Sequence, residues 1–244
     1  MSPTTSHNVL VQPALKSDRS PSVNSTLRAV TNKKSYWDVM LNPWLTISVI
    51  LVIVLSYVYV DRSLALFLHQ LHLKKELPIL YWITCLGVTQ AYLILLPLAA
   101  ACSFLFVHNK KAEHRLWFLW SCVLFTSLIN IILKMTLGRA RPELFFDQQL
   151  FGFYGWHVQE SFYSFPSGHT TAITSLMLGL MISFPRYRYA FAIMGLLVIS
   201  TRVLLTYHYL SDILATMYLT CIELGLLFYM IRRWHPKTWG LVLK

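Results

Sequence analysis

The chain has 244 residues, of which 56% are hydrophobic and only 13% are charged, and its formal net charge is +11. Soluble domains seldom combine so many apolar residues with so few charges, so the composition excludes an ordinary soluble protein. A net positive charge is also typical of nucleic-acid-binding proteins. Here the basic residues are distributed as in a membrane protein, and we predict no nucleic-acid partner.

The N-terminal segment, residues 1–42, is predicted to be a disordered cytoplasmic tail. Eleven of the residues Met1–Ser35 are Ser or Thr, and the segment has little apolar periodicity. It also lacks the apolar core of a secretory signal. The remaining residues, 43–244, are predicted to form one membrane domain.

Six apolar blocks predict an all-α, polytopic membrane protein with six transmembrane helices in a bundle. In chain order they are Trp44–Val60, Ile79–Val107, Leu116–Leu137, His169–Phe184, Tyr189–Tyr207 and Ile213–Ile231. The second block is long and the fourth is short for a hydrocarbon core of about 30 Å, so we expect tilt or an interfacial extension there. Residues 62–77, between the first two blocks, predict a short helix in the membrane interface.

The basic residues predict the orientation. If the N-terminal tail is cytoplasmic and the sides alternate, 14 of the 21 Lys and Arg residues lie inside. This asymmetry predicts a multi-pass protein of the cytoplasmic membrane with both termini inside. Lys134, Arg141 and Arg202 would lie on the outer side near lipid. A charge at the centre of a membrane helix costs about 2.5–3.5 kcal/mol, which a bound anion would offset.

The longest outer connection, residues 138–166, carries nine aromatic residues. A loop of this length is usually functional or disordered, and its composition argues against disorder. Two interpretations stay open: the aromatic residues anchor the loop at the lipid headgroups, or the loop forms a lid over a lipid-binding mouth.

The acidic and cysteine residues indicate no metal site. The acids of this loop, Glu143, Asp147 and Glu160, form no persuasive metal cage. The cysteines all lie within predicted spans, and their spacing fits no zinc site. We interpret them as small packing residues rather than disulfide partners; they are Cys85, Cys102, Cys122 and Cys221.

The first of three polar stretches is "LKMTLGRARP", at the outer end of the third block. Lys134 and Arg141 are seven residues apart, which is about two helical turns. Gly138 and Pro142 predict that the helix ends between them, which would let the two side chains converge. The alternative is that both residues only snorkel from a helix end.

The second stretch is "SFPSGH", at the start of the fourth block. Pro166 breaks the preceding chain, and a helix is predicted to begin at about His169. The amides of Ser167, Gly168 and His169 would then be unpaired donors at a helix N-terminus, which is a ready anion site. His169 would lie at its edge, where it can exchange a proton.

The third stretch, "STRVLLTYHYLSD", holds Arg202, His208 and Asp212. His208 and Asp212 are four residues apart and would be neighbours on one face of a continuous helix. A carboxylate bonded to one imidazole nitrogen fixes the tautomer and raises the basicity of the other nitrogen, as a histidine nucleophile requires. A purely structural His–Asp pair would give the same pattern.

The alternation of spans places all three stretches on one side of the membrane, where their cations, histidines and helix N-terminus would form a phosphate site. Their order and spacing resemble the three-part signature of the type 2 phosphatidic acid phosphatases. These are integral-membrane lipid phosphatases related in fold to the vanadium haloperoxidases. The resemblance covers residues 116–231, and it departs from the family pattern at Thr201, where Ser usually precedes the third-motif Arg.

The resemblance implies a metal-independent reaction that needs no other cofactor and in which each motif residue has a role. His208 would attack phosphorus to give a phosphohistidine, Asp212 would orient it, and His169 would protonate the leaving oxygen and then help to activate water. The implied phosphate-binding residues are Lys134, Arg141, Arg202, Ser167 and Gly168.

The predicted function is therefore a phosphatase that hydrolyses a phosphomonoester or pyrophosphate of a membrane lipid at the outer, extracytoplasmic face. The substrates considered are undecaprenyl pyrophosphate, phosphatidylglycerophosphate, phosphatidic acid and lipid A phosphates. Two alternatives stay open: a lipid phosphotransferase that uses the same intermediate, and a non-enzymatic lipid transporter or binder. The predicted partners are the lipid substrate and the bilayer, and the sequence does not predict the oligomeric state.

Overall fold

The computed structural model of the chain describes residues 42–234. These residues form helices and connecting loops with no β-strand; their only sheet-like contacts are isolated bridges from Arg139 to Phe153 and to Tyr163. The predicted all-α class is confirmed. The predicted cytoplasmic tail lies outside the described residues, apart from residue 42.

Five helical segments in the described part of the chain are long and apolar enough to cross a membrane. They are Pro43–Gln70, Thr89–Val107, Lys110–Leu137, Pro185–Leu204 and Leu210–Trp234. The protein is therefore a multi-pass membrane protein. The predicted count of six includes one helix, α10 (Gly168–Ser183), that is shorter than these segments.

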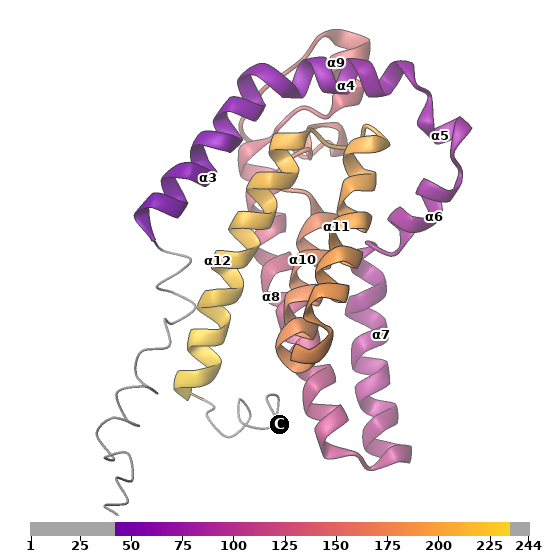
Figure 1. Cartoon of the computed structure of the whole chain (residues 1–244), viewed down its shortest axis with the longest axis vertical. Coiled ribbons are helices and arrows are strands. Elements are labelled where there is room, and N and C mark those ends of the chain that lie inside the picture. Colours follow the sequence, from indigo (N-terminus) through magenta and orange to yellow (C-terminus); the bar gives the residue numbers. More distant parts are fainter. Residues whose placement is uncertain (1–41, 235–244) are drawn as a thin grey trace, which may run out of the picture. The chain divides into compact units, whose positions relative to one another are not determined.

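Helix α10 is buried among the other long helices of the bundle (Figure 1). The bounds are α8 Lys110–Leu137, α10 Gly168–Ser183, α11 Arg188–Leu204 and α12 Leu210–Trp234. Most α10 side chains are buried. A hydrogen bond of 2.7 Å between the hydroxyls of Thr126 and Ser175 joins α8 to α10 inside the bundle, as is common between membrane helices.

The second apolar block forms two helices, and of these only the second, which continues to Val107, is long and apolar enough to cross a membrane. Helix α6 (Ile79–Cys85) ends at a turn, and α7 (Thr89–Cys102) starts a new direction and continues into a π-helical turn, Ser103–Val107. Gly87 in the break packs against the second motif: a Cβ there would lie 2.9 Å from Cδ2 of His169. The break thus brings backbone close to the predicted site.

The first apolar block continues further than predicted. Helix α3 (Pro43–Leu55) passes through a π-helical turn, Ser56–Val60, into α4 (Asp61–Gln70), and α5 (Leu73–Glu76) follows. The predicted interfacial helix is thus partly an extension of the first helix. In Figure 1, α4 lies beside α9 (Pro142–Gln148) at one end of the bundle. This path places Asp61 at the end of the bundle that holds the three motifs.

Candidate active site

The three motifs meet at one end of the bundle. Lys134 lies in the last turn of α8, His169 in the first turn of α10, Arg202 in the last turn of α11 and Asp212 in the first turn of α12. Because successive helices run in opposite directions, these four termini lie on one side. The structure therefore brings together the residues that the motifs predicted to converge.

His208 is buried in the turn between α11 and α12, with 3% of its surface exposed. Its Nδ1 lies 2.6 Å from the carbonyl oxygen of Ser164. Burial, and then the charges of the motif residues Arg202, Arg141 and Lys134, hold the pKa of His208 well below its usual value. A neutral imidazole beside a carbonyl must carry its proton on Nδ1, since a carbonyl only accepts. Nε2 therefore keeps its lone pair, as a nucleophile requires.

Asp212 lies beside His208, as predicted, but no direct hydrogen bond joins the two side chains. Its Oδ2 lies 3.9 Å from Nδ1 of His208. Helix α12 begins only at Leu210, so the two residues do not share a continuous helix. Asp212 Oδ2 instead accepts hydrogen bonds from Ser164 Oγ at 2.6 Å and from the Tyr209 amide at 3.0 Å. Asp212 thus positions Ser164, and the Ser164 carbonyl orients the imidazole.

Arg139 is a central residue of the site to which the sequence analysis gave no role. It is 2% exposed. Its Nη2 lies 2.7 Å from Asp61 Oδ2, and its Nη1 pairs with the Asp212 carboxylate and donates to Ser211 Oγ at 2.9 Å. Ser211 also donates to Asp61 through both its amide and its hydroxyl. We call Arg139, Asp61, Asp212 and Ser211 the Arg139 cluster; it joins α4 to the residues that hold His208.

Aromatic rings enclose the Arg139 guanidinium. The ring centroids of Tyr57, Phe151, Phe153 and Tyr209 lie 4.8–5.7 Å from its Cζ. Burial opposes the charge, but Asp212 and Asp61 outweigh it and raise the pKa of Arg139. Two aromatic residues of the long loop therefore wall in a buried ion cluster. Neither the anchor nor the lid interpretation included this role.

The guanidinium groups of Arg141 and Arg202 have unused donors. Arg202 Nη1 donates to Thr84 Oγ1 at 3.1 Å, and Arg141 Nη1 lies 3.2 Å from the exposed carboxylate of Glu160. The Nε atoms of both arginines are buried, and no acceptor for them exists among residues 42–234. Buried donors are normally satisfied, so these two favour a bound anion.

Lys134 faces the N-terminus of α10. A Cβ added to Gly168 would lie 3.4 Å from Lys134 Nζ. The amides of Gly168 and His169, at the first two positions of the helix, have no acceptor within it. The prediction that the Ser167 amide is an unpaired donor is wrong, because this amide donates to Thr216 Oγ1 at 3.0 Å. The Ser167 side chain instead caps α10, accepting from the Thr170 amide at 3.4 Å.

No group of three or more His, Cys, Asp or Glu side chains within residues 42–234 is placed to hold a metal ion. The four cysteines are free thiols. Lys134, Arg141, Arg202 and the start of α10 place positive charge at this site.

Gly138 ends α8 between Lys134 and Arg141, as predicted. Its φ is +53°, and a Cβ there would lie 1.9 Å from the carbonyl oxygen of Gly155. We expect Gly138→Ala to cost about 1–3 kcal/mol of stability and to displace both cations. The measurement is thermal unfolding in detergent. Gly155→Ala is the matched control, since its φ is +79° but nothing lies within 4 Å; equal losses in both variants would contradict the steric explanation.

The chain belongs to the PAP2 superfamily, whose sequence profile matches residues 115–236, half of the chain. The predicted family is confirmed. Two curated relatives are the lipid A 1-phosphatases of Rhizobium etli (strain CFN 42) and Rhizobium johnstonii (strain 3841), each 39% identical over 98 residues, or 40% of this chain. The match covers 42% and 40% of those proteins, so the chain spans about two fifths of their length.

Among solved structures, the chain is similar to a PAP2-type phosphatidylglycerolphosphate phosphatase from Bacillus subtilis. The TM-score is 0.49 and the identity 17%, over 77% of this chain and 96% of that one.

Proposed function

We propose that the protein is an integral-membrane phosphatase that removes a phosphate from a lipid phosphomonoester or pyrophosphate. The observation that carries the proposal is the buried His208 imidazole, whose Nδ1 lies 2.6 Å from the Ser164 carbonyl oxygen and whose pKa is lowered by burial and then by Arg202, Arg141 and Lys134. A nucleophile among cations suits attack on a phosphate. Membership of the PAP2 superfamily and the names of the two relatives support the same chemistry.

In the proposed reaction, His208 Nε2 attacks phosphorus to form an N–P bond, and the bond from phosphorus to the lipid oxygen breaks. That oxygen keeps the electron pair and takes a proton from His169. Water then attacks phosphorus, His169 takes its proton, and the N–P electrons return to Nε2 as orthophosphate leaves. Lys134, Arg141, Arg202 and the Gly168 amide stabilise the charge on the phosphoryl oxygens.

We further propose that the site faces the outside of the cytoplasmic membrane, with both chain termini inside. The distribution of basic residues supports this orientation. The substrates considered from the sequence remain candidates: undecaprenyl pyrophosphate, phosphatidylglycerophosphate, phosphatidic acid and lipid A phosphates. The names of the two relatives favour the last of these.

The proposal is tested by phosphate release from these four lipids in detergent, with and without EDTA. We expect turnover of at least one lipid, unchanged by EDTA because side chains supply the charge, and inhibited by vanadate because it mimics the five-coordinate transition state. Release without an added lipid acceptor separates hydrolysis from phosphotransfer. No release from any lipid, or a loss with EDTA that magnesium reverses, would contradict the proposal.

The role of His169 is tested through the leaving group. A lipid monophosphate leaves as an alkoxide and needs a proton, whereas an aryl phosphate leaves as a stable phenolate. We expect His169→Ala to lower kcat about 10²–10⁴-fold on the lipid substrate and much less on the aryl phosphate. His114→Ala, at the start of α8 and far along the helix from Lys134, is the control. Equal losses on both substrates would show that His169 is not the proton donor.

A further inference from the structure

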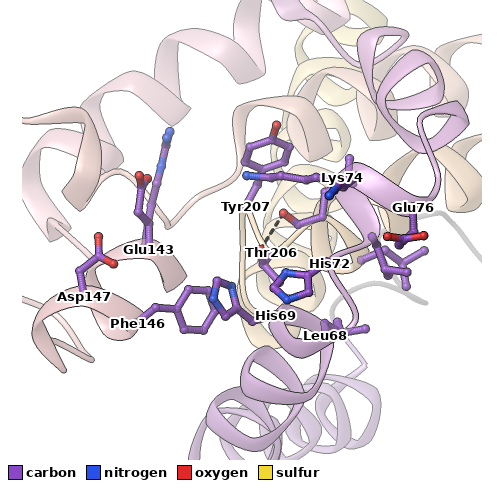
Figure 2. Close-up of a pocket in the computed structure, with 15 residues that line it drawn as sticks. Leu68, His69, His72, Lys74, Glu76, Glu143, Phe146, Asp147, Thr206 and Tyr207 are labelled. Carbon is purple, nitrogen blue, oxygen red and sulfur yellow. Dashed lines mark hydrogen bonds between the residues drawn. The ribbon is translucent and has the colours of Figure 1, made fainter.

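A cavity of about 580 Å³ opens beside the candidate active site, bordered by α4, α5, α9 and the turn after α11 (Figure 2). Arg141 lines both the cavity and the phosphate site. Tyr207 also lines it, and its ring centroid lies 4.2 Å from Arg202 Cζ and 4.3 Å from Lys74 Nζ. A phosphate held by Arg141 and Arg202 would therefore adjoin this cavity. Small-molecule sites have volumes of about 300–1,000 Å³, so this cavity has room for more than a phosphate.

The cavity is lined by acidic, basic and aromatic side chains. In Figure 2, Glu143 and Asp147 of α9 lie on one side, and Lys74, Glu76 and Tyr207 lie on the other. Between these two sides, the ring of His69 stacks on the ring of Phe146 in α9, with centroids 4.0 Å apart. A ligand in the cavity would thus meet carboxylates, an ammonium group and flat aromatic faces.

The lining residues determine which kinds of lipid headgroup the cavity can bind. An acyl chain would cover Glu143, Asp147 and Lys74 without giving them hydrogen-bond partners, which is unfavourable. A second phosphate would meet three carboxylates, those of Glu76, Glu143 and Asp147, and only two ammonium groups, since Arg141 is already used by the first phosphate; the remaining charge therefore does not favour it. Hydroxyl groups fit this lining, because they donate to carboxylates and accept from an ammonium group. The C–H faces of a sugar ring would also pack on the aromatic rings.

We propose that this cavity binds a polyhydroxylated headgroup, such as a sugar ring, that carries the phosphate to be hydrolysed. The inference rests on the proposed phosphatase function and narrows its substrate class. Glu143 and Asp147 are then specificity-determining residues, which accept hydrogen bonds from the headgroup hydroxyls and do not touch the phosphate.

The test compares two substrates of equal chain length, an acylated glucosamine 1-phosphate and an alkyl monophosphate. We expect the Glu143→Ala, Asp147→Ala double variant to lose at least about tenfold in kcat/KM on the sugar lipid, mainly through KM, since hydrogen bonds to charged groups are lost. Its kcat/KM on the alkyl phosphate should change less than about threefold, because that substrate cannot reach these acids. Glu113→Ala, a carboxylate in the first turn of α8, is the control.

Equal losses on both substrates, or no loss on either, would overturn the proposal. So would a preference for a bisphosphorylated headgroup that is lost in Lys74→Ala, since this would assign the cavity to a second phosphate. Binding of both lipids to the His208→Asn background gives the same comparison without turnover. If the wild-type protein releases no phosphate but the double variant still weakens binding of the sugar lipid alone, the phosphatase proposal fails and the cavity assignment stands.

Discussion

Replacing His208 with alanine is expected to lower kcat at least about 10⁴-fold and to leave no phosphorylated enzyme. The reason is that Nε2 is the only proposed bond-forming atom, and its lone pair is free because Nδ1 donates to the Ser164 carbonyl. The cations and the α10 N-terminus would still bind the substrate, so KM should change much less than kcat. The measurements are phosphate release and retention of labelled phosphate on the protein.

A second variant separates catalysis from folding. The amide of His208→Asn can still donate to the Ser164 carbonyl, as Nδ1 does, but provides no nucleophilic nitrogen. We expect this variant to be as inactive as the alanine variant while unfolding close to the wild-type temperature. His114→Ala should retain full activity. Substantial turnover by either His208 variant would show that another group attacks phosphorus.

Replacing Arg139 with methionine is expected to cost about 3–5 kcal/mol of stability, the largest loss for any residue discussed. Asp61 and Asp212 would then remain buried together without a counter-charge. Activity should also fall, because Asp212 holds Ser164 and Ser164 orients His208. The measurement is the free energy of unfolding in detergent, with phosphate release on the same samples.

The control for this prediction is Arg62→Met, because Arg62 is the next residue after Asp61 in the chain. Arg62 is exposed and lies over the ring of Phe151 at 4.8 Å, and its loss should cost less than about 1 kcal/mol. Adding Asp61→Asn to Arg139→Met should recover part of the stability, because one uncompensated charge is removed. A loss below about 1 kcal/mol in Arg139→Met, or strictly additive effects in the double variant, would contradict the account of the Arg139 cluster.

The sequence predicted the elements that local chemistry determines. Gly138 and Pro142 predicted where α8 ends, and Pro166 predicted the start of α10. Apolar blocks predicted most of the membrane helices, and helix alternation then predicted that Lys134 and Arg202 would lie on one side. Each of these inferences needs only backbone preferences, hydrophobicity and helix direction.

The features that the sequence did not predict depend on contacts between distant segments. Asp61 and Arg139 are 78 residues apart and form an ion pair only because α4 crosses the end of the bundle. The spacing of His208 and Asp212 fits a helix, but α12 starts between them, and the Ser164 carbonyl takes the place predicted for the carboxylate. The break after α6 was missed because the apolar block has no charge or proline at that point. The reason for a glycine at position 87 becomes clear only from its close contact with His169.

The central claim is that His208 Nε2 receives the phosphoryl group. The most direct measurement is to incubate the protein with lipid substrate labelled in its phosphate, quench without acid, and locate the label by peptide mass spectrometry. The account predicts acid-labile phosphate on His208 in the wild-type protein and none in the His208→Asn variant. Label on another residue, or its persistence in that variant, would contradict the account.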